Sequence, residues 1–270
     1  MNSKNKRLLN NEVPVIYDEK TCTYFKRFPE WWDNIEKYEV DTLYVIKKFS
    51  NKNKYFIDIG AWYGFMSIYA NYFYRNVKAI EGDPKALLAL QGNIKINKCN
   101  NIDIIPFVLT DYNGVCSFGG NGNLGNAEST ILVNTENYAS KKKAIPDNRF
   151  KNSDYVLQDI VERPCINIDK LVEKLGDEYI SNVSLIKMDI EGGEFIILKD
   201  LIDKVLRNNK EIKLFISLHW IFLSIENIKF CAELLSNNFL FLYNKNYDKI
   251  NIENIMNNKI HDILCSNTEI

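Results

Sequence analysis

The sequence predicts an α/β protein built on a doubly wound, mostly parallel sheet of seven strands. Two observations favour this fold class. Short apolar runs of strand length alternate with helical stretches over residues 55–109 and again over residues 183–235, a rhythm typical of parallel sheets covered by helices. In addition, the first of these strands runs directly into a glycine turn, as strands do at the ligand-binding edge of such sheets.

The first block of alternation follows a helix for which Asp41 is a suitable N-cap and which extends to Phe49. The helix after the second strand starts at Pro84, and proline is favoured in the first turn of a helix. The elements predicted for this block are strands at Tyr55–Ile59, Val77–Ile80 and Ile102–Leu109 and helices at Gly64–Phe73 and Pro84–Ile96.

The rhythm breaks after residue 113 and resumes near residue 183. Residues 114–133 mix short β runs with a glycine- and asparagine-rich loop, and residues 134–154 are polar without a pattern. We therefore expect an irregular insertion at about residues 114–160 inside one domain of residues 51–270, preceded by an N-terminal helical extension over residues 1–50. The later elements are strands at Val183–Met188, Ile212–Leu218, Phe239–Tyr243 and Asp262–Cys265 and helices at Gly193–Leu206 and Ile225–Leu235.

Composition narrows the classes of partner and compartment. The formal net charge is −1 and the pI is about 6.2, so no basic footprint for nucleic acid or anionic lipid is expected. No apolar run reaches the length of a signal peptide or a membrane span. The six cysteines form no C-x-x-C pair and neither of the two histidines stands near a cysteine cluster. These features predict a cytoplasmic protein with reduced thiols and no zinc site.

The glycine turn lies in "YFIDIGAWYGFMS", residues 55–67. A phosphate-binding loop would need a lysine after Gly64, and a dinucleotide-binding turn would need G-x-G-x-x-G; the sequence has neither. Asp58 stands two residues before Gly60 and would repel a pyrophosphate, by about 4 kcal/mol per pair of charges at about 4 Å and an effective dielectric constant near 20.

S-adenosylmethionine reverses the sign of that interaction, because it carries a sulfonium and an ammonium group. Glu81 ends the second predicted strand, 21 residues after Gly60, where Rossmann-like folds place an acid that binds ribose hydroxyls. Asp58, Gly60, Gly64 and Glu81 together predict an adenosyl ligand with a positive end. The alternative is that the glycines only permit tight packing of strand on helix and that Glu81 is a solvated turn residue.

A second group of residues lies in "KMDIEGGE", residues 187–194, at the end of the fourth predicted strand. Asp189, Glu191 and Glu194 are costly to bury together without a cation or protons. They are therefore candidates to face the sulfonium, to bind a divalent metal or to deprotonate an acceptor hydroxyl, with Asp189 the first candidate base. His219, after the fifth strand, is the second candidate. The alternative is that Glu191 and Glu194 bind first-turn helix amides and that His219 is a core residue.

Other polar and aromatic residues are candidates for the acceptor site. The loop "GGNGNLGNAES" offers Asn126, Glu128 and Ser129, and loops of this kind often carry specificity. Trp31 and Trp32 are able to stack on a sugar ring, although packing of the N-terminal helix on the sheet is the favoured explanation for them.

The chain resembles the FkbM family of S-adenosylmethionine-dependent methyltransferases over about residues 38–220. The resemblance rests on the pattern K-x-D-x-E-G-x-E at Lys187–Glu194, on Tyr38–Glu39 upstream, and on the segments "FIDIGAWYGFMSI", "VKAIEGDPKALLALQGNIKIN", "FVLTDYNGVCSF", "INIDKL" and "SLIKMDIEGGEFIIL". The sequence departs from the family at Trp62, where an asparagine is usual, and at Ser217, where many members have an acid.

This resemblance implies a Rossmann-like class I methyltransferase fold and O-methylation of a sugar or glycan hydroxyl. It implies cofactor contacts from Glu39, Asp58, Gly60, Ala61, Gly64, Glu81, Asp111 and Asp189, catalytic roles for Asp189, Glu191 and His219, and acceptor contacts from Asn126, Ser129 and Glu194. Two alternatives remain. One is a nucleotide-sugar or NAD-dependent oxidoreductase on a similar fold, and the other is a degenerate cofactor-binding protein without activity.

Overall fold

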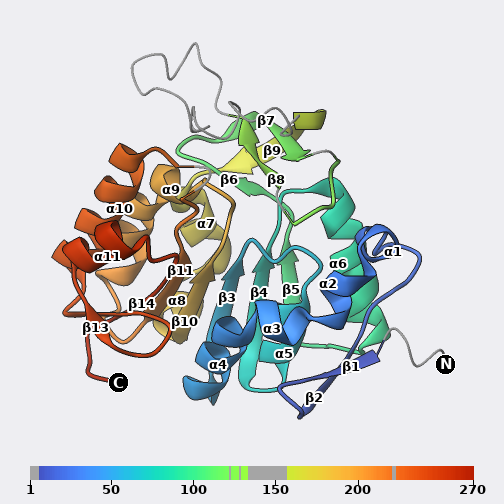
Figure 1. Cartoon of the computed structure of the whole chain (residues 1–270), viewed down its shortest axis with the longest axis horizontal. Coiled ribbons are helices and arrows are strands. Elements are labelled where there is room, and N and C mark those ends of the chain that lie inside the picture. Colours follow the sequence, from blue (N-terminus) through green and yellow to red (C-terminus); the bar gives the residue numbers. More distant parts are fainter. Residues whose placement is uncertain (1–5, 122, 128, 133–156, 221–222) are drawn as a thin grey trace.

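The computed structural model describes residues 6–121, 123–127, 129–132, 157–220 and 223–270. Its main sheet has the strand order β13-β12-β14-β11-β10-β3-β4-β5 (Figure 1). The five strands from β5 to β11 are parallel, and β14 is antiparallel to both of its neighbours. The strand bounds are β3 Asn51–Ile59, β4 Tyr74–Ile80, β5 Ile102–Ile105, β10 Val183–Met188, β11 Lys213–Ser217, β12 Phe241–Tyr243, β13 Lys249–Ile250 and β14 Asp262–Ser266.

The chain order winds outward in both directions from the pair β3 and β10, which confirms the doubly wound, mostly parallel Rossmann-like fold. Successive residues of β3 point to opposite faces: Phe56 belongs to one buried cluster and Ile57 to the other. The main sheet has eight strands among the described residues, one more than the seven expected. The additional strand is β13, which has only two residues and shows no alternation in the sequence.

Helices cover both faces of this sheet (Figure 1). Apolar residues of α4, α5 and α6 pack into one cluster, and those of α7, α9 and α10 pack into the other. The bounds are α4 Val40–Lys48, α5 Phe65–Asn71, α6 Pro84–Ile96, α7 Ile168–Leu175, α8 Asp177–Ser181, α9 Glu194–Leu201, η3 Ile202–Leu206, α10 Ile225–Asn238 and α11 Ile252–Asn258. The predicted helix at 193–206 therefore ends in a π-type turn, η3. None of the described helices has both the length and the apolar content needed to cross a lipid bilayer.

The insertion expected at about residues 114–160, with short β runs over residues 114–133, is more regular than predicted where the structure describes it. Four strands form a second sheet in the order β6-β9-β7-β8, which lies above the ends of β3, β4 and β5 (Figure 1). The glycines inside β7 lower the β-propensity of this segment, so the sequence pattern did not indicate a continuous strand there. Residues 133–156, which include the whole patternless stretch of residues 134–154, lie outside the described residues. The bounds are β6 Val108–Leu109, β7 Gly114–Asn121, β8 Ser129–Leu132 and β9 Leu157–Ile166.

The strand predicted at Ile102–Leu109 is two strands in different sheets, β5 and β6. Pro106 lies between them, and proline has no amide hydrogen to donate to the sheet. The break lets the chain leave the main sheet and start the second one.

The N-terminal extension, which was expected to be helical, contains a β-hairpin as well as helices. Its antiparallel strands pair Lys6–Leu9 with Val13–Ile16. Asp41 is not an N-cap, because α4 starts at Val40 and the residue before it is Glu39, which makes no capping hydrogen bond. The bounds are β1 Lys6–Leu9, β2 Val13–Ile16, α1 Tyr24–Arg27, α2 Pro29–Asp33 and α3 Ile35–Tyr38.

Candidate functional site

A cavity of about 240 Å³ lies at the carboxyl ends of β3, β4 and β10, the edge at which open α/β sheets bind ligands. The second sheet and the N-terminal helices supply its other walls. Eight of the residues predicted from the sequence line it, namely Glu39, Gly60, Ala61, Glu81, Asn126, Ser129, Asp189 and Glu191. Five others do not, namely Asp58, Gly64, Asp111, Glu194 and His219.

Both glycines of the turn after β3 have a positive φ, +80° at Gly60 and +82° at Gly64. A Cβ on Gly60 would stand 1.8 Å from the carbonyl oxygen of Asp189, so the turn and the end of β10 approach through their backbones. A Cβ on Gly64 would meet Leu90 of α6 at 2.2 Å. Gly60 therefore shapes the cavity, whereas Gly64 permits close packing against α6, a role in packing like the alternative above except that its neighbour is a helix.

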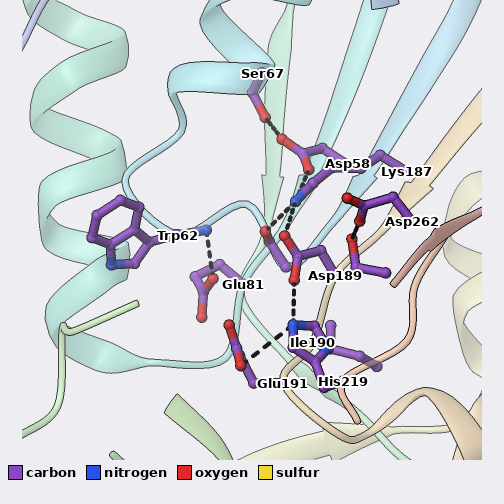
Figure 2. A network of polar contacts seen from close by, with 12 residues as sticks. Asp58, Trp62, Ser67, Glu81, Lys187, Asp189, Ile190, Glu191, His219 and Asp262 are labelled. Carbon is purple, nitrogen blue, oxygen red and sulfur yellow. Dashed lines mark hydrogen bonds and ion pairs between the residues drawn. The ribbon is translucent and has the colours of Figure 1, made fainter. Parts of the chain in front are cut away.

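Asp58 is fully buried and is not among the residues that line the cavity, and its carboxylate is directed at Ser67 and Lys187 (Figure 2). Ser67 Oγ donates a hydrogen bond to its Oδ2 at 2.6 Å, and Lys187 Nζ lies 3.4 Å from its Oδ1. Burial raises the pKa of Asp58, although Lys187 opposes that shift. Direct contact of Asp58 with a cofactor was therefore the wrong expectation, because its charge holds Lys187 in place.

Lys187 is the functional residue that sequence reasoning missed, although it stands in the quoted motif. It is nearly fully buried, and its Nζ donates to the carbonyl oxygen of Gly60 at 3.1 Å and lies 3.4 Å from Asp189 Oδ2. Lys187 thus ties the glycine turn to the end of β10. A lysine two residues before an acid on one strand shares its face, and this spacing was the available signal.

Asp189 lies between two cationic groups. Its Oδ2 faces Lys187, and its Oδ1 lies 3.2 Å from His219 Nε2 (Figure 2). Burial alone would raise the pKa of Asp189, but Lys187 and His219 hold it below its usual range. Such a carboxylate keeps its negative charge firmly and is a weak proton acceptor.

His219 lies among three acids. Its Nε2 is 3.4 Å from Glu191 Oε2, and its Nδ1 is 2.7 Å from Glu194 Oε1, which also accepts a hydrogen bond from the backbone nitrogen of Ile190 at 3.2 Å. Burial opposes a charge on His219, yet the acids raise its pKa well above the usual value. Glu194 is fully buried and so contacts His219 and Ile190 instead of an acceptor. Glu191 stands at φ +52°, and burial raises its pKa against the effect of His219.

Glu81 lies at the tip of β4, as predicted (Figure 2). It accepts hydrogen bonds from the backbone nitrogens of Trp62 and Asp83, each at 2.7 Å. Burial raises its pKa to about 7 although these two donors oppose the shift. Glu39 reaches the cavity from the start of α4, and burial together with Asp189 raises its pKa to about 7.

Asp83 joins the second sheet to α6. One carboxylate oxygen accepts from the helix amides of Lys85 and Ala86, and the other accepts from Gly125 N and from Ser129 Oγ, both at 2.6 Å. The hydroxyl of Ser129 is thus already committed to Asp83. Asn126 lines the cavity, and Glu128 lies outside the described residues.

Aromatic rings form one wall of the cavity. Trp31, Tyr24 and Trp62 line it, and Trp62 contacts the other two edge-on. Trp62 occupies a positive φ of +47°, and its Nε1 donates to the carbonyl oxygen of Gly125 at 3.1 Å. Trp32 is buried instead in the cluster on this face of the sheet. Asp111 is exposed, so the structure does not bring it to the cavity.

The family model described as "Methyltransferase FkbM domain" matches residues 58–247. No curated protein matches the chain in sequence. A solved FkbM methyltransferase from Methylobacillus flagellatus KT is 17% identical, with a TM-score of 0.44, over 79% of this chain and 43% of its own, so this chain spans less than half of that protein.

Two other solved structures are also similar. One is a precorrin-6y C5,15-methyltransferase from Geobacter metallireducens GS-15, at 14% identity and a TM-score of 0.41 over 74% of this chain and 71% of its own. The other is precorrin 8w decarboxylase from Methanobacterium thermoautotrophicum, at 16% identity and a TM-score of 0.39 over 76% and 73%.

Proposed function

Because the chain belongs to the FkbM methyltransferase family, we propose that it transfers a methyl group from S-adenosylmethionine to a hydroxyl of a sugar or glycan. One observation carries the proposal. Three acids from separate elements, Glu39, Glu81 and Asp189, line a single cavity beside the Gly60 turn. A ligand that is cationic at one end and has hydroxyls at the other suits this lining.

Glu81 is the ribose-binding residue in this proposal. Two backbone amides fix its orientation, and its ionised form accepts hydrogen bonds from the ribose hydroxyls. Glu39 and Asp189 attract the ammonium and sulfonium groups, and Lys187 keeps Asp189 ionised and in place. Asp58 was expected to repel a pyrophosphate but does not line the cavity. The cavity still disfavours a pyrophosphate ligand, because Glu39, Glu81 and Asp189 line it and repel negative charge.

Methyl transfer is an in-line displacement that needs positioning and a proton acceptor. The acceptor oxygen forms a bond to the methyl carbon as the bond from sulfur to that carbon breaks, and S-adenosylhomocysteine leaves. The hydroxyl proton passes to a base. Asp189 has both oxygens engaged by Lys187 and His219, so Glu191, which lines the cavity, takes the proton, and Asp189 orients the cofactor.

The aromatic wall supports a sugar-like acceptor. Trp31 and Tyr24 offer apolar surface to the CH face of a sugar ring, while Asn126 offers an amide to its hydroxyls. The direct test is to incubate the chain with S-adenosylmethionine carrying an isotopically labelled methyl group and a panel of sugars and glycans. Transfer of the label to an oxygen of the sugar, as a methyl ether, supports the proposal. Transfer only to nitrogen or carbon atoms would contradict it and would assign another class of acceptor.

Cofactor affinity is expected to fall at acid pH. Glu81 has a raised pKa of about 7 in the free protein, and the ligand binds its ionised form, so affinity is constant above pH 7 and weakens below it. The change at Glu81 alone raises the Kd of S-adenosylhomocysteine about tenfold from pH 8 to pH 6, about 1.4 kcal/mol. Glu39, whose pKa is also raised to about 7, adds to this loss because its ionised form attracts the ammonium group. Calorimetry at both pH values measures this.

The same raised pKa makes ionised Glu81 unfavourable in the folded chain without ligand. Its contribution to stability is complete below pH 4.5 and is lost as the pH rises through about 7. Glu81→Gln is expected to weaken S-adenosylhomocysteine by about 1.5–3 kcal/mol at pH 8 and to flatten the pH dependence. Glu233→Gln, on the exposed face of α10, is the matched control. A Glu81→Gln variant with native affinity would remove Glu81 from the cofactor site.

A further inference from the structure

Both ring nitrogens of His219 face carboxylate oxygens. Nδ1 faces Glu194 at 2.7 Å, and Nε2 faces Asp189 at 3.2 Å and Glu191 at 3.4 Å. A neutral imidazole has one N–H and one lone pair. One nitrogen would then direct a lone pair at a carboxylate, so the arrangement requires either a second ring proton or a cation.

Glu194 indicates which nitrogen carries the proton. Its Oε1 already accepts from the backbone of Ile190, and the side chain is fully buried. With an ion bound, this oxygen accepts again from Nδ1–H of His219 and the Nε2 lone pair is directed at the ion, whereas in the ion-free chain a second ring proton takes the place of the ion. A carboxylate that orients a histidine through its other nitrogen is the usual outer-shell arrangement of a metal-binding histidine.

We propose that Asp189, Glu191 and His219 bind a divalent cation, with Glu194 as the residue that positions His219. One ligand atom from each of the three lies within 4.8 Å of the others. Lys187 approaches the opposite oxygen of Asp189, Oδ2, and leaves Oδ1 to the ion. Because Asp189 and Glu191 line the cavity, the open side of the ion faces the space assigned to the acceptor.

The ligand set narrows the choice of ion. One imidazole nitrogen with two carboxylates suits Mn²⁺, Fe²⁺ or Zn²⁺ better than Ca²⁺ or Mg²⁺, which prefer oxygen ligands alone. Charge also favours a dication, since Asp58, Asp189, Glu191 and Glu194 gather around Lys187 and His219. Glu191 has two carboxylate oxygens, so that one binds the ion while the other takes the hydroxyl proton. Only the use of the ion in acidifying an acceptor hydroxyl rests on the proposed function; the binding of the ion does not.

The test uses the full chain after chelator treatment, without cofactor. Mn²⁺ is titrated while electron paramagnetic resonance follows the free ion, and pulsed measurements detect coupling to imidazole nitrogen. We expect one ion per chain with nitrogen coupling. His219→Gln should abolish the coupling, and His219→Gln and Glu191→Gln should each weaken binding at least about tenfold. Glu233→Gln should bind as the native chain does.

Two variants of Glu194 separate positioning from folding. Glu194→Gln keeps an acceptor oxygen for Nδ1–H and should retain Mn²⁺ within a few-fold, whereas Glu194→Ala should lose about 10–100-fold. Circular dichroism confirms that each variant is folded. Absence of saturable Mn²⁺ binding, or binding unchanged in folded Glu191→Gln, would overturn the proposal and leave His219 a doubly protonated partner of the acids. Neither result would touch methyl transfer, which is assayed separately with and without chelator.

Discussion

Asp189→Asn is expected to lower turnover at least about 100-fold, the scale of loss when a group that positions a reactant is displaced. The carboxylate at the end of β10 keeps its charge between Lys187 and His219. An amide is nearly the same size but supplies no charge to the sulfonium and presents an N–H to one of these cationic neighbours. Turnover of labelled S-adenosylmethionine on a responsive acceptor measures the effect.

Binding and stability measurements assign the cause of that loss. Affinity for S-adenosylhomocysteine should stay within about tenfold of the native value, since Glu81 and the Gly60 turn remain, and the free energy of unfolding should fall by about 1–3 kcal/mol for the impaired charged hydrogen bonds. A variant that melts earlier but keeps native turnover would make Asp189 a structural residue only. If the proposed ion binds, Asp189→Asn should also abolish any stimulation by Mn²⁺.

Gly60→Ala is expected to destabilise the chain by about 2–5 kcal/mol and to abolish cofactor binding. The positive φ of +80° costs a non-glycine residue about 1–2 kcal/mol, and the new Cβ would overlap the backbone carbonyl of Asp189 at 1.8 Å, which adds about 1–3 kcal/mol. The overlap separates the glycine turn from β10, so both walls of the cavity move. Denaturant unfolding and calorimetry with S-adenosylhomocysteine measure the two effects.

Gly176→Ala is the matched control for backbone strain. Gly176 also has a positive φ, +78°, but a Cβ there meets no atom within 4 Å. It should show the strain cost alone and bind cofactor normally. Equal destabilisation by the two substitutions would mean that the close approach to Asp189 contributes nothing.

The parallel core of the fold was predictable because each of its strands is a continuous apolar run with helical stretches on either side. β3, β4 and β10 were placed within a few residues of their true ends, and the glycine turn was placed at the ligand edge. The second sheet was not predictable, since β7 carries glycines and its partner β9 lies 36 residues beyond its end, so that no local pattern joins them.

The sequence predicted which residues lie at the ligand-binding edge of the sheet, but it did not predict which of their side chains contact one another. Glu81, Asp189 and Glu191 reach the cavity because they follow strands whose carboxyl ends share one edge of the sheet. Sequence spacing does not show which charges pair. Lys187 forms an ion pair with Asp58, and Glu194 is hydrogen-bonded to His219, which lies 25 residues further along the chain. The first pair depends on the pairing of β10 with β3 and the second on packing between α9 and the end of β11, which only the folded chain defines.

The central claim is that the acidic cavity beside Gly60 binds S-adenosylmethionine. Calorimetric titration of the chain with S-adenosylhomocysteine and, separately, with NAD at pH 8 tests it most directly. The account predicts saturable binding of one S-adenosylhomocysteine per chain, weakened in Glu81→Gln and native in Glu233→Gln, and no saturable heat with NAD. Tight binding of NAD without any response to S-adenosylhomocysteine would contradict it and would favour an oxidoreductase.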